Sequence, residues 1–240
     1  MQVRGFIRKS PSLVETLKNG QYCPICLICE EDLRHFYRWY FIEYYNDATW
    51  IGTTMESGGF CKKHSQDLID MGKEHEMSVV YDYLVNVTIT RLERVLKDIG
   101  IYEYENRLRK IIKKIIDTEN RQEFIIRLRH TEICPICKSI SNSEDKWIQY
   151  LITDLDDEEI KGLYLNSKGL CMNHFRQALK FASPETAEVL IQKQADILRK
   201  LKSDLEEYMR KTDYRYAHEP KSDEQTAWIR AIRFFAGKEL

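Results

Sequence analysis

Apolar residues recur every three or four positions along most of this chain, which is the spacing of one helix face. The first long run of this kind comprises Leu33, Phe36, Tyr37, Tyr40, Phe41, Tyr44 and Tyr45. A second run comprises Trp147, Ile148, Leu151, Ile152 and Leu155. No segment alternates apolar and polar residues in the way a half-buried strand does. The pattern therefore predicts an all-α fold.

Further helices are expected over 47–57, 79–99, 104–129, 156–166 and 183–210. The last of these begins at Ser183-Pro184-Glu185, where the proline takes the first helical position. Ser222 and Gln225 form a capping box, which predicts a final helix that carries Trp228. Glycine and proline number only 10 and 5, so few positions interrupt helices.

Two pairs of short phrases carry the most distinctive chemistry. The first pair reads Cys23-Pro24-Ile25-Cys26 and Cys61-Lys62-Lys63-His64, and the second reads Cys134-Pro135-Ile136-Cys137 and Cys171-Met172-Asn173-His174. Each pair offers three thiols and one imidazole, the ligand set of a tetrahedral zinc site. We therefore predict two zinc ions, one held within each pair. The predicted ligands are Cys23, Cys26, Cys61 and His64 at one ion, and Cys134, Cys137, Cys171 and His174 at the other.

The two pairs belong to an internal duplication. Cys23 and Cys134 are 111 positions apart, whereas Cys61 and Cys171 are 110 apart. The second copy is therefore one residue shorter than the first between its two phrases. At the offset of 110 the apolar frame also matches, and Gly59 corresponds to Gly169. Repetition of both motifs with their apolar frame indicates a repeated metal-bearing unit.

The duplication suggests a domain organisation. We expect a first metal-binding helical unit over 1–105, a connecting helix over 106–130 and a second metal-binding unit over 131–210. Residues 211–240 form a C-terminal docking segment and helix.

A closed site with four protein ligands has no position for water or substrate, which favours structural over catalytic zinc. An iron–sulfur cluster is the alternative cofactor, because Cys23, Cys26 and Cys29 form CxxCxxC and Cys61 could supply a fourth thiolate. The second copy has Ile140 where a third cysteine would be needed. Cys29 is more typical of a buried small apolar residue.

A charged and aromatic cluster precedes the last helix and comprises Asp213, Tyr214, Arg215, His218 and Glu219. It could be a buried ion-pair clasp with Arg215 largely buried and Trp228 packed on the core, or it could line a pocket. Two functions follow. One is a protein- or nucleic-acid-interaction module with structural metals, and the other is an enzyme whose pocket lies near this cluster.

The remaining composition restricts the partners. The basic stretch over 107–129 could contact nucleic acid, but a net charge of −1 favours the solvated face of a helix. No apolar run reaches the roughly 20 residues of a membrane span. Six of the seven cysteines have metal-ligand spacing, which suits a reducing cytoplasm. A protein partner or a homo-oligomer is compatible with all of this.

The order of motifs resembles a family of uncharacterised bacterial and archaeal proteins known as a domain of unknown function. The resemblance runs from Cys23 to Gly237. Besides the eight cysteines and histidines named above, it rests on Asp213, Tyr214, Arg215, Glu219, Pro220 and Trp228. It implies the duplicated architecture and no reaction. Cys29 and the basic stretch are not features of the resemblance.

Overall fold

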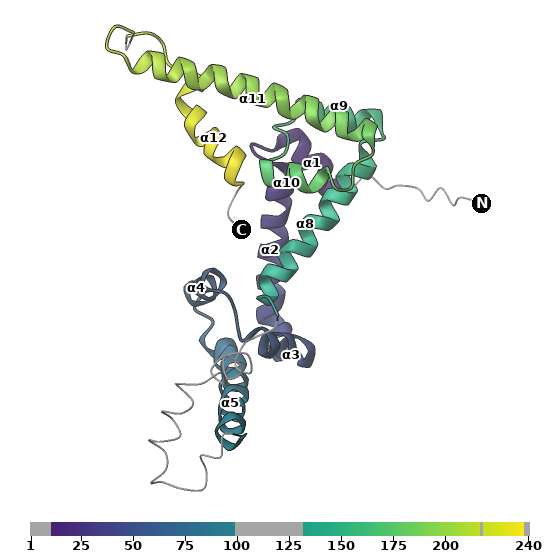
Figure 1. Ribbon diagram of the computed structural model, residues 1–240, viewed down its shortest axis with the longest axis vertical. Helices are drawn as coiled ribbons and strands as arrows, with labels where there is room; N and C mark the ends of the chain where they lie inside the picture. Colours follow the sequence, from purple (N-terminus) through teal and green to yellow (C-terminus); the bar gives the residue numbers. More distant parts are fainter. Residues whose placement is uncertain (1–10, 99–131, 217, 238–240) are drawn as a thin grey trace, which may run out of the picture. The chain divides into compact units, whose positions relative to one another are not determined.

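The computed structural model describes residues 11–98, 132–216 and 218–237. Within these ranges the chain forms α-helices and short 3-10 turns and no strand, which confirms the predicted all-α class (Figure 1). The helix expected over 104–129, with its basic stretch, lies outside the described residues, as does the whole of the predicted connecting helix over 106–130.

The chain divides into two compact units, and the boundary falls inside two helices. Unit 1 is drawn from positions 1–35 and 140–240, and unit 2 from positions 36–139. Helices α2 (Pro24–Ile42) and α8 (Pro135–Asp154) therefore each contribute residues to both units. The compact units and the two sequence copies are thus different divisions of the chain.

Unit 1 contains the larger core. Besides parts of α2 and α8, it comprises α1 (Pro11–Asn19), α9 (Glu158–Asn166), α10 (Met172–Ala178), α11 (Pro184–Thr212), the turn η3 (Asp223–Thr226) and α12 (Ala227–Ala236). Leu13, Ile25 and Ile148 are fully buried in one apolar cluster with Leu190. Helix α1 was not predicted, although Leu13 and Leu17 have the spacing of one helix face.

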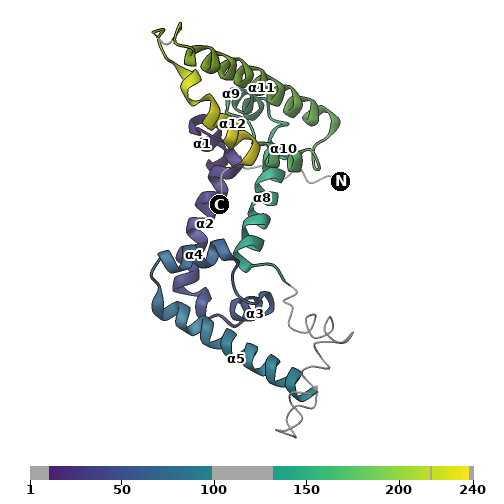
Figure 2. The same cartoon turned by 60° about the vertical axis from the view of Figure 1, so that its left-hand side comes forward.

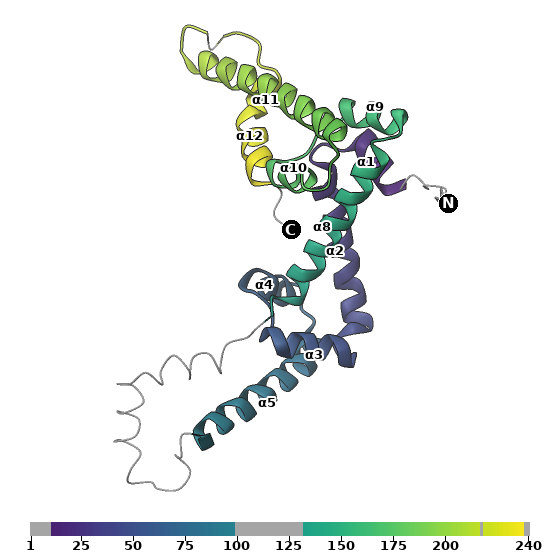
Figure 3. The ribbon, with the colours of Figure 1, turned by 45° about the vertical axis from the view of Figure 1, so that its right-hand side comes forward.

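Helix α12 packs against α11 and α10 (Figure 3). Ala227 and Phe234 are buried beside Leu201 of α11, whereas Trp228 is 49% exposed. The expected packing of Trp228 into the core is therefore wrong, because the opposite face of the amphipathic helix points inward. The predicted capping box is also wrong. The backbone amide of Ser222 donates to Glu224 at 2.9 Å, and the Ser222 side chain caps no helix.

Unit 2 comprises the last seven residues of α2, the turn η1 (Tyr44–Asn46), α3 (Ala48–Ser57), α4 (Lys62–Asp70) and α5 (Glu74–Asp98), with the first residues of α8 (Figure 2). Aromatic rings fill the space between α2 and α3. The ring centroids of Phe36 and Trp50 are 5.2 Å apart, and those of Tyr40 and Phe60 are 5.8 Å apart. Edge-on aromatic contacts of this kind stabilise a core beyond simple area burial.

The local structure of the two copies agrees in detail, as the duplication predicts. Asp47 and Asp157 both cap the N-terminus of a short helix with their carboxylates. Gly59 and Gly169 both have positive φ, the conformation that glycine adopts without strain. Cys61 and Cys171 both precede a helix with φ near −68°. Each Cys-x-x-His therefore opens a helix and directs both side chains to one side.

Candidate metal centres

Four ligand atoms converge at two places in the described residues. Site 1 comprises Cys23, Cys26, Cys171 and His174, and site 2 comprises Cys61, His64, Cys134 and Cys137. In each site the four ligand atoms all lie within 4.8 Å of one another. All eight residues singled out from the sequence are thus brought into groups that could hold a metal ion.

The predicted pairing of the phrases is wrong. Each site combines the CPxC phrase of one copy with the CxxH phrase of the other, so that the two copies exchange their N-terminal phrases. Site 1 lies wholly within unit 1 and site 2 wholly within unit 2. Each compact unit therefore holds one Cys3His group.

Helix length explains the exchange. A helix of 19 residues such as α2 is about 28 Å long. Cys23 directly precedes its first residue, whereas the phrase Cys61–His64 is held at its second half. There the Tyr37 hydroxyl donates to Asp67 of α4 at 3.0 Å, and Phe60 contacts Tyr40. These contacts hold the segment of Cys61 beside residues 37–40 of α2, more than three helical turns along the helix from Cys23.

Site 1 is deeply buried. All four of its ligand residues are buried, and its three cysteines belong to the main apolar cluster of unit 1. The Nδ1 atom of His174 lies 3.4 Å from the Cys23 sulfur, 3.4 Å from Cys26 and 3.3 Å from Cys171. The sulfurs of Cys26 and Cys171 are 3.8 Å apart.

The imidazole of site 1 also has a polar partner on its side away from the three sulfurs. The Nε2 atom of His174 lies 3.1 Å from a carboxylate oxygen of Glu144 on α8. A carboxylate behind a ligating histidine fixes the ring orientation and raises the basicity of the ligand nitrogen. Glu144 was not identified from the sequence. No sequence signal points to it, because Glu144 and His174 are 30 positions apart and only the fold brings them together.

Site 2 has similar distances but more exposure. The Nδ1 atom of His64 lies 3.2 Å from the Cys61 sulfur, 3.6 Å from Cys134 and 3.4 Å from Cys137. The sulfurs of Cys61 and Cys137 are 3.7 Å apart, and both residues are partly exposed. The Nε2 atom of His64 is buried and has no hydrogen-bond partner in the described residues.

The electrostatics of the two histidines differ. Burial acts to lower the pKa of His174, but hydrogen bonds with Cys171, Cys26 and Glu144 outweigh it and raise the pKa to about 12. Burial lowers the pKa of His64, and the opposing charge of Asp67 does not reverse that effect. The two imidazoles therefore lie in different electrostatic surroundings.

Each site also contains one thiol that readily loses its proton. Hydrogen bonds from Cys23 and Cys26 lower the pKa of Cys171 far below that of an ordinary thiol. Burial acts to raise the pKa of Cys61, but the backbone amides of His64 and Lys63 and the neighbouring thiols lower it on balance. Thiolates are the form in which cysteine binds metals.

Cys29 is not part of either site. Its sulfur lies 3.9 Å from the hydroxyl of Ser143, and burial raises the pKa of its thiol to about 12. Cys61, the fourth thiol of the alternative iron–sulfur set, belongs to site 2 instead. The structure therefore does not assemble Cys23, Cys26, Cys29 and Cys61 at one place, and that ligand set is wrong.

The charged cluster before α12 pairs its charges at the surface of unit 1. The Arg215 side chain is 62% exposed and pairs with Asp213 two residues away at 2.6 Å, and Tyr214 and His218 are also exposed. Glu219 pairs with Arg210 of α11. The expectation that Arg215 pairs with an acid is confirmed, but its expected burial is wrong because the pair closes locally on the surface.

Comparison with known proteins supplies no reaction. No curated protein and no solved structure matches the chain. None of the described helices is both long and apolar enough to span a bilayer. One family model matches residues 11–240, nearly the whole sequence. With its two Cys3His groups and its duplicated helices, the chain belongs to a family of unknown function, DUF6062.

Proposed function

We propose that both sites bind zinc and that the two ions are structural. The observation that carries the proposal is the set of distances between ligand atoms. A tetrahedral ion with bonds of about 2.3 Å to sulfur and about 2.05 Å to nitrogen separates two sulfurs by about 3.8 Å and a sulfur from a nitrogen by about 3.5 Å. One sulfur pair in site 1 lies at 3.8 Å and one in site 2 at 3.7 Å, and the sulfur–nitrogen pairs lie at 3.2–3.6 Å.

These distances favour one ion over a cluster. The four protein ligands of an iron–sulfur cluster are distributed over two or more irons, so ligands on different irons lie farther apart than the 4.8 Å within which all four atoms of each site lie. Four protein ligands also complete a tetrahedral site and leave no position for substrate. The ions would then act by joining α2 to α10 in unit 1, and α4 to α8 in unit 2.

Elemental analysis of the full chain purified without added metal tests this proposal. We expect about two equivalents of zinc per chain and no visible absorption band, because Zn²⁺ has a filled d shell. The variant Cys137→Ser should lose one equivalent, and Cys29→Ser should keep both. A brown protein containing iron and sulfide would overturn the proposal.

We further propose a protein-interaction role, with the zinc-clasped helices as a rigid support. Trp228, Ile232 and Phe235 are 49–58% exposed and recur at helical spacing along one face of α12. Large apolar side chains gathered on one exposed face are typical of protein-binding surfaces. The alternative enzyme reading relied on a pocket near Asp213–Glu219, and the pairing of those charges on the surface favours the interaction role.

Site-specific photo-crosslinking in the native cell tests the interaction role. A photoreactive residue at Trp228 or Ile232 should give the same discrete crosslinked species, and Ile232→Lys should prevent it. A photoreactive residue at the exposed Lys202 of α11 serves as the control and should give none. Equal crosslinking from Lys202, or none from α12, would contradict the proposal.

We also propose that the chain functions in a reducing cytoplasm. All seven cysteines are free, and six of them belong to the two sites. Oxidising compartments would convert such clustered thiols into disulfides in competition with metal.

A further inference from the structure

A cavity of about 360 Å³ lies in unit 1 beside site 1. Residues of α11 and α12 line it, together with the segments 21–26 and 167–171 that carry ligands of site 1. The volume falls at the lower end of the roughly 300–1,000 Å³ found for small-molecule pockets. The cavity therefore has room for a small organic molecule.

The lining of this cavity is strongly cationic. Five basic side chains face two acidic ones, Asp196 and Asp223. The basic residues are Lys168, Lys193, Lys200, Arg230 and Arg233. A zinc ion with three thiolates would add only one formal negative charge at one end. The cavity thus keeps an excess of positive charge whether or not site 1 holds zinc.

Only part of that charge is compensated by the protein. Lys200 and Arg230 share the carboxylate of Asp204, at 2.6 and 2.9 Å. Lys193 donates to the backbone carbonyl of Leu165 at 2.6 Å. Its charge has no carboxylate partner within hydrogen-bonding distance in the described part of the chain. The Nε atom of Arg230 is buried and makes no hydrogen bond to the described residues.

Lys168, on the turn before Cys171, and Lys193, on α11, both line this cavity. Burial lowers the pKa of Lys193, and the charge of Lys168 adds to that effect although Asp196 opposes it. An anion bound in the cavity beside these ammonium groups would stabilise their charged forms. Apolar side chains complete the cavity and comprise Leu170, Ile197, Leu201 and Phe234.

We propose that this cavity binds a small amphipathic organic anion, with its carboxylate or phosphate group at Lys168 and Lys193 and its apolar body against Ile197, Leu201 and Phe234. The charged group satisfies the uncompensated cations, and the apolar body displaces water from the side chains of α11 and α12. This site does not depend on the identity of the metal, because the residues that bind the anion are not ligands of site 1.

Isothermal titration calorimetry of the full chain with its native metal content tests the proposal, with decanoate, decyl phosphate and 1-decanol as probes. Decanoate or decyl phosphate should bind at one site per chain, and the tighter of the two identifies the headgroup. The neutral alcohol should bind at least about tenfold more weakly, because a hydrogen bond to a charged group contributes that much. Equal affinity for the alcohol would overturn the proposal, as would the absence of binding by both anions.

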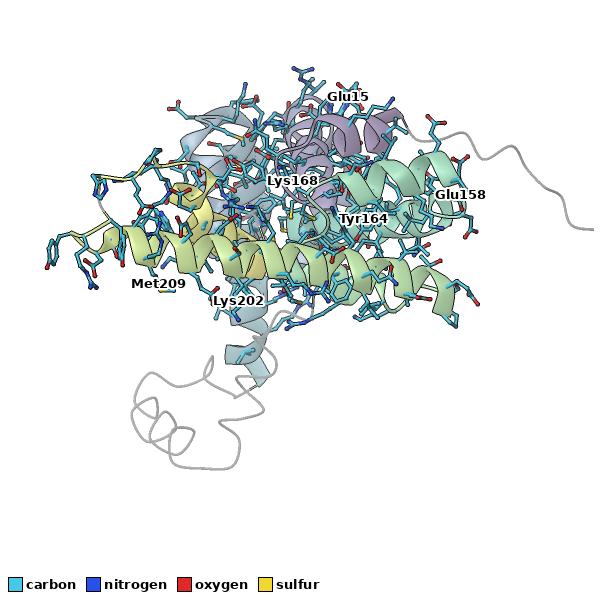
Figure 4. All side chains as sticks on the ribbon, turned by 90° about the horizontal axis from the view of Figure 1, so that it is seen from above. Glu15, Glu158, Tyr164, Lys168, Lys202 and Met209 are labelled. Atoms are coloured by element: carbon cyan, nitrogen blue, oxygen red, sulfur yellow. The ribbon has the colours of Figure 1, made fainter. Side chains whose placement is uncertain are left out.

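Charge variants locate the site. Lys193→Met keeps the aliphatic stem and should weaken binding at least about tenfold, and Lys193→Arg should restore it. Lys202→Met is the matched control, because Lys202 is nine residues farther along α11 and therefore half a turn out of phase with Lys193. Figure 4 shows Lys168 and Lys202 on opposite sides of α11. Equal weakening by Lys202→Met would show non-specific attraction to the surface and would overturn the proposal.

Discussion

Sites 1 and 2 use the same ligand types, three cysteines and one histidine, yet their surroundings differ. Site 1 is buried within the main apolar cluster, and Glu144 holds its imidazole. In site 2 two cysteines are partly exposed, and the Nε2 atom of His64 lacks a partner in the described part of unit 2. A duplicated motif therefore fixes the ligand set, whereas the surrounding core decides how firmly that set is held. We expect site 1 to be the stable centre and site 2 the labile one.

The largest expected effect is on stability. Cys171→Ser removes a ligand from the buried site and should lower the melting temperature by about 10 °C or more, because zinc ligation contributes several kcal/mol to folding. Cys61→Ser at the more exposed site should have a smaller effect, measured by calorimetry. Cys29→Ser is the control for replacing a buried thiol by a hydroxyl. Equal losses from Cys171→Ser and Cys61→Ser would contradict the expected difference between the sites.

The second largest effect is expected on the rate at which the two sites release metal. A chelator added to the native protein should remove zinc in two phases, and the slow phase should belong to site 1. Glu144→Ala removes the carboxylate behind His174 and should accelerate the slow phase by about 10–100-fold, the usual effect of losing such a partner. A metallochromic indicator measures both phases, and the fast phase in the same sample is the internal control. A slow phase that Glu144→Ala leaves unchanged would show that the carboxylate does not secure site 1.

An ion pair between α11 and α12 should have an intermediate effect. Asp204 is 94% buried and pairs with Arg230 of α12 at 2.9 Å. Asp204→Asn should cost about 1–3 kcal/mol and reduce the hydrogen-exchange protection of α12. Loss of zinc should not accompany this change. Equal loss of protection throughout unit 1 would show that the pair does not act on α12 alone.

The same pair predicts a pH dependence. Burial acts to raise the pKa of Asp204, but Lys200 and Arg230 outweigh it and hold the pKa below its ordinary value. The stabilisation is therefore complete above the ordinary carboxyl pKa of about 3.9 and is lost as pH falls through the lower folded pKa. Protection factors of α12 measured from pH 6 to pH 3 should stay constant down to about the ordinary carboxyl pKa of 3.9 and should fall below it. The Asp204→Asn variant should lack that component, which separates it from the release of zinc by acid.

The smallest expected effect is at Arg215. Its exposed pair with Asp213 closes over two residues, so Arg215→Ala should leave the melting temperature nearly unchanged. Differential scanning fluorimetry beside Cys171→Ser measures the contrast. A large fall in the melting temperature would show that the segment before α12 does stabilise unit 1. The expectation that site 1 is the main source of stability would then be wrong.

Local rules in the sequence correctly gave several elements of this fold. The 3.6-residue periodicity located α2, α8 and α11, because an apolar face must be buried whatever it packs against. Asp47 and Asp157 cap their helices through side chains only two or three residues away. The three-residue spacing of each Cys-x-x-His likewise brings its two ligands together on the first turn of a helix.

Tertiary structure decided which local pieces meet. Sequence order suggested that Cys23 and Cys26 share an ion with Cys61 and His64. The length of α2 separates these two phrases, and Cys171 and His174 lie beside Cys23 and Cys26 instead. The periodicity of α12 likewise could not tell that Phe234 rather than Trp228 is buried. By itself the sequence determined most of the described helices and the eight candidate ligands, because these depend on neighbours within a few residues. The exchange between copies depends on the lengths and packing of helices far apart in the chain, and only the folded structure contains that information.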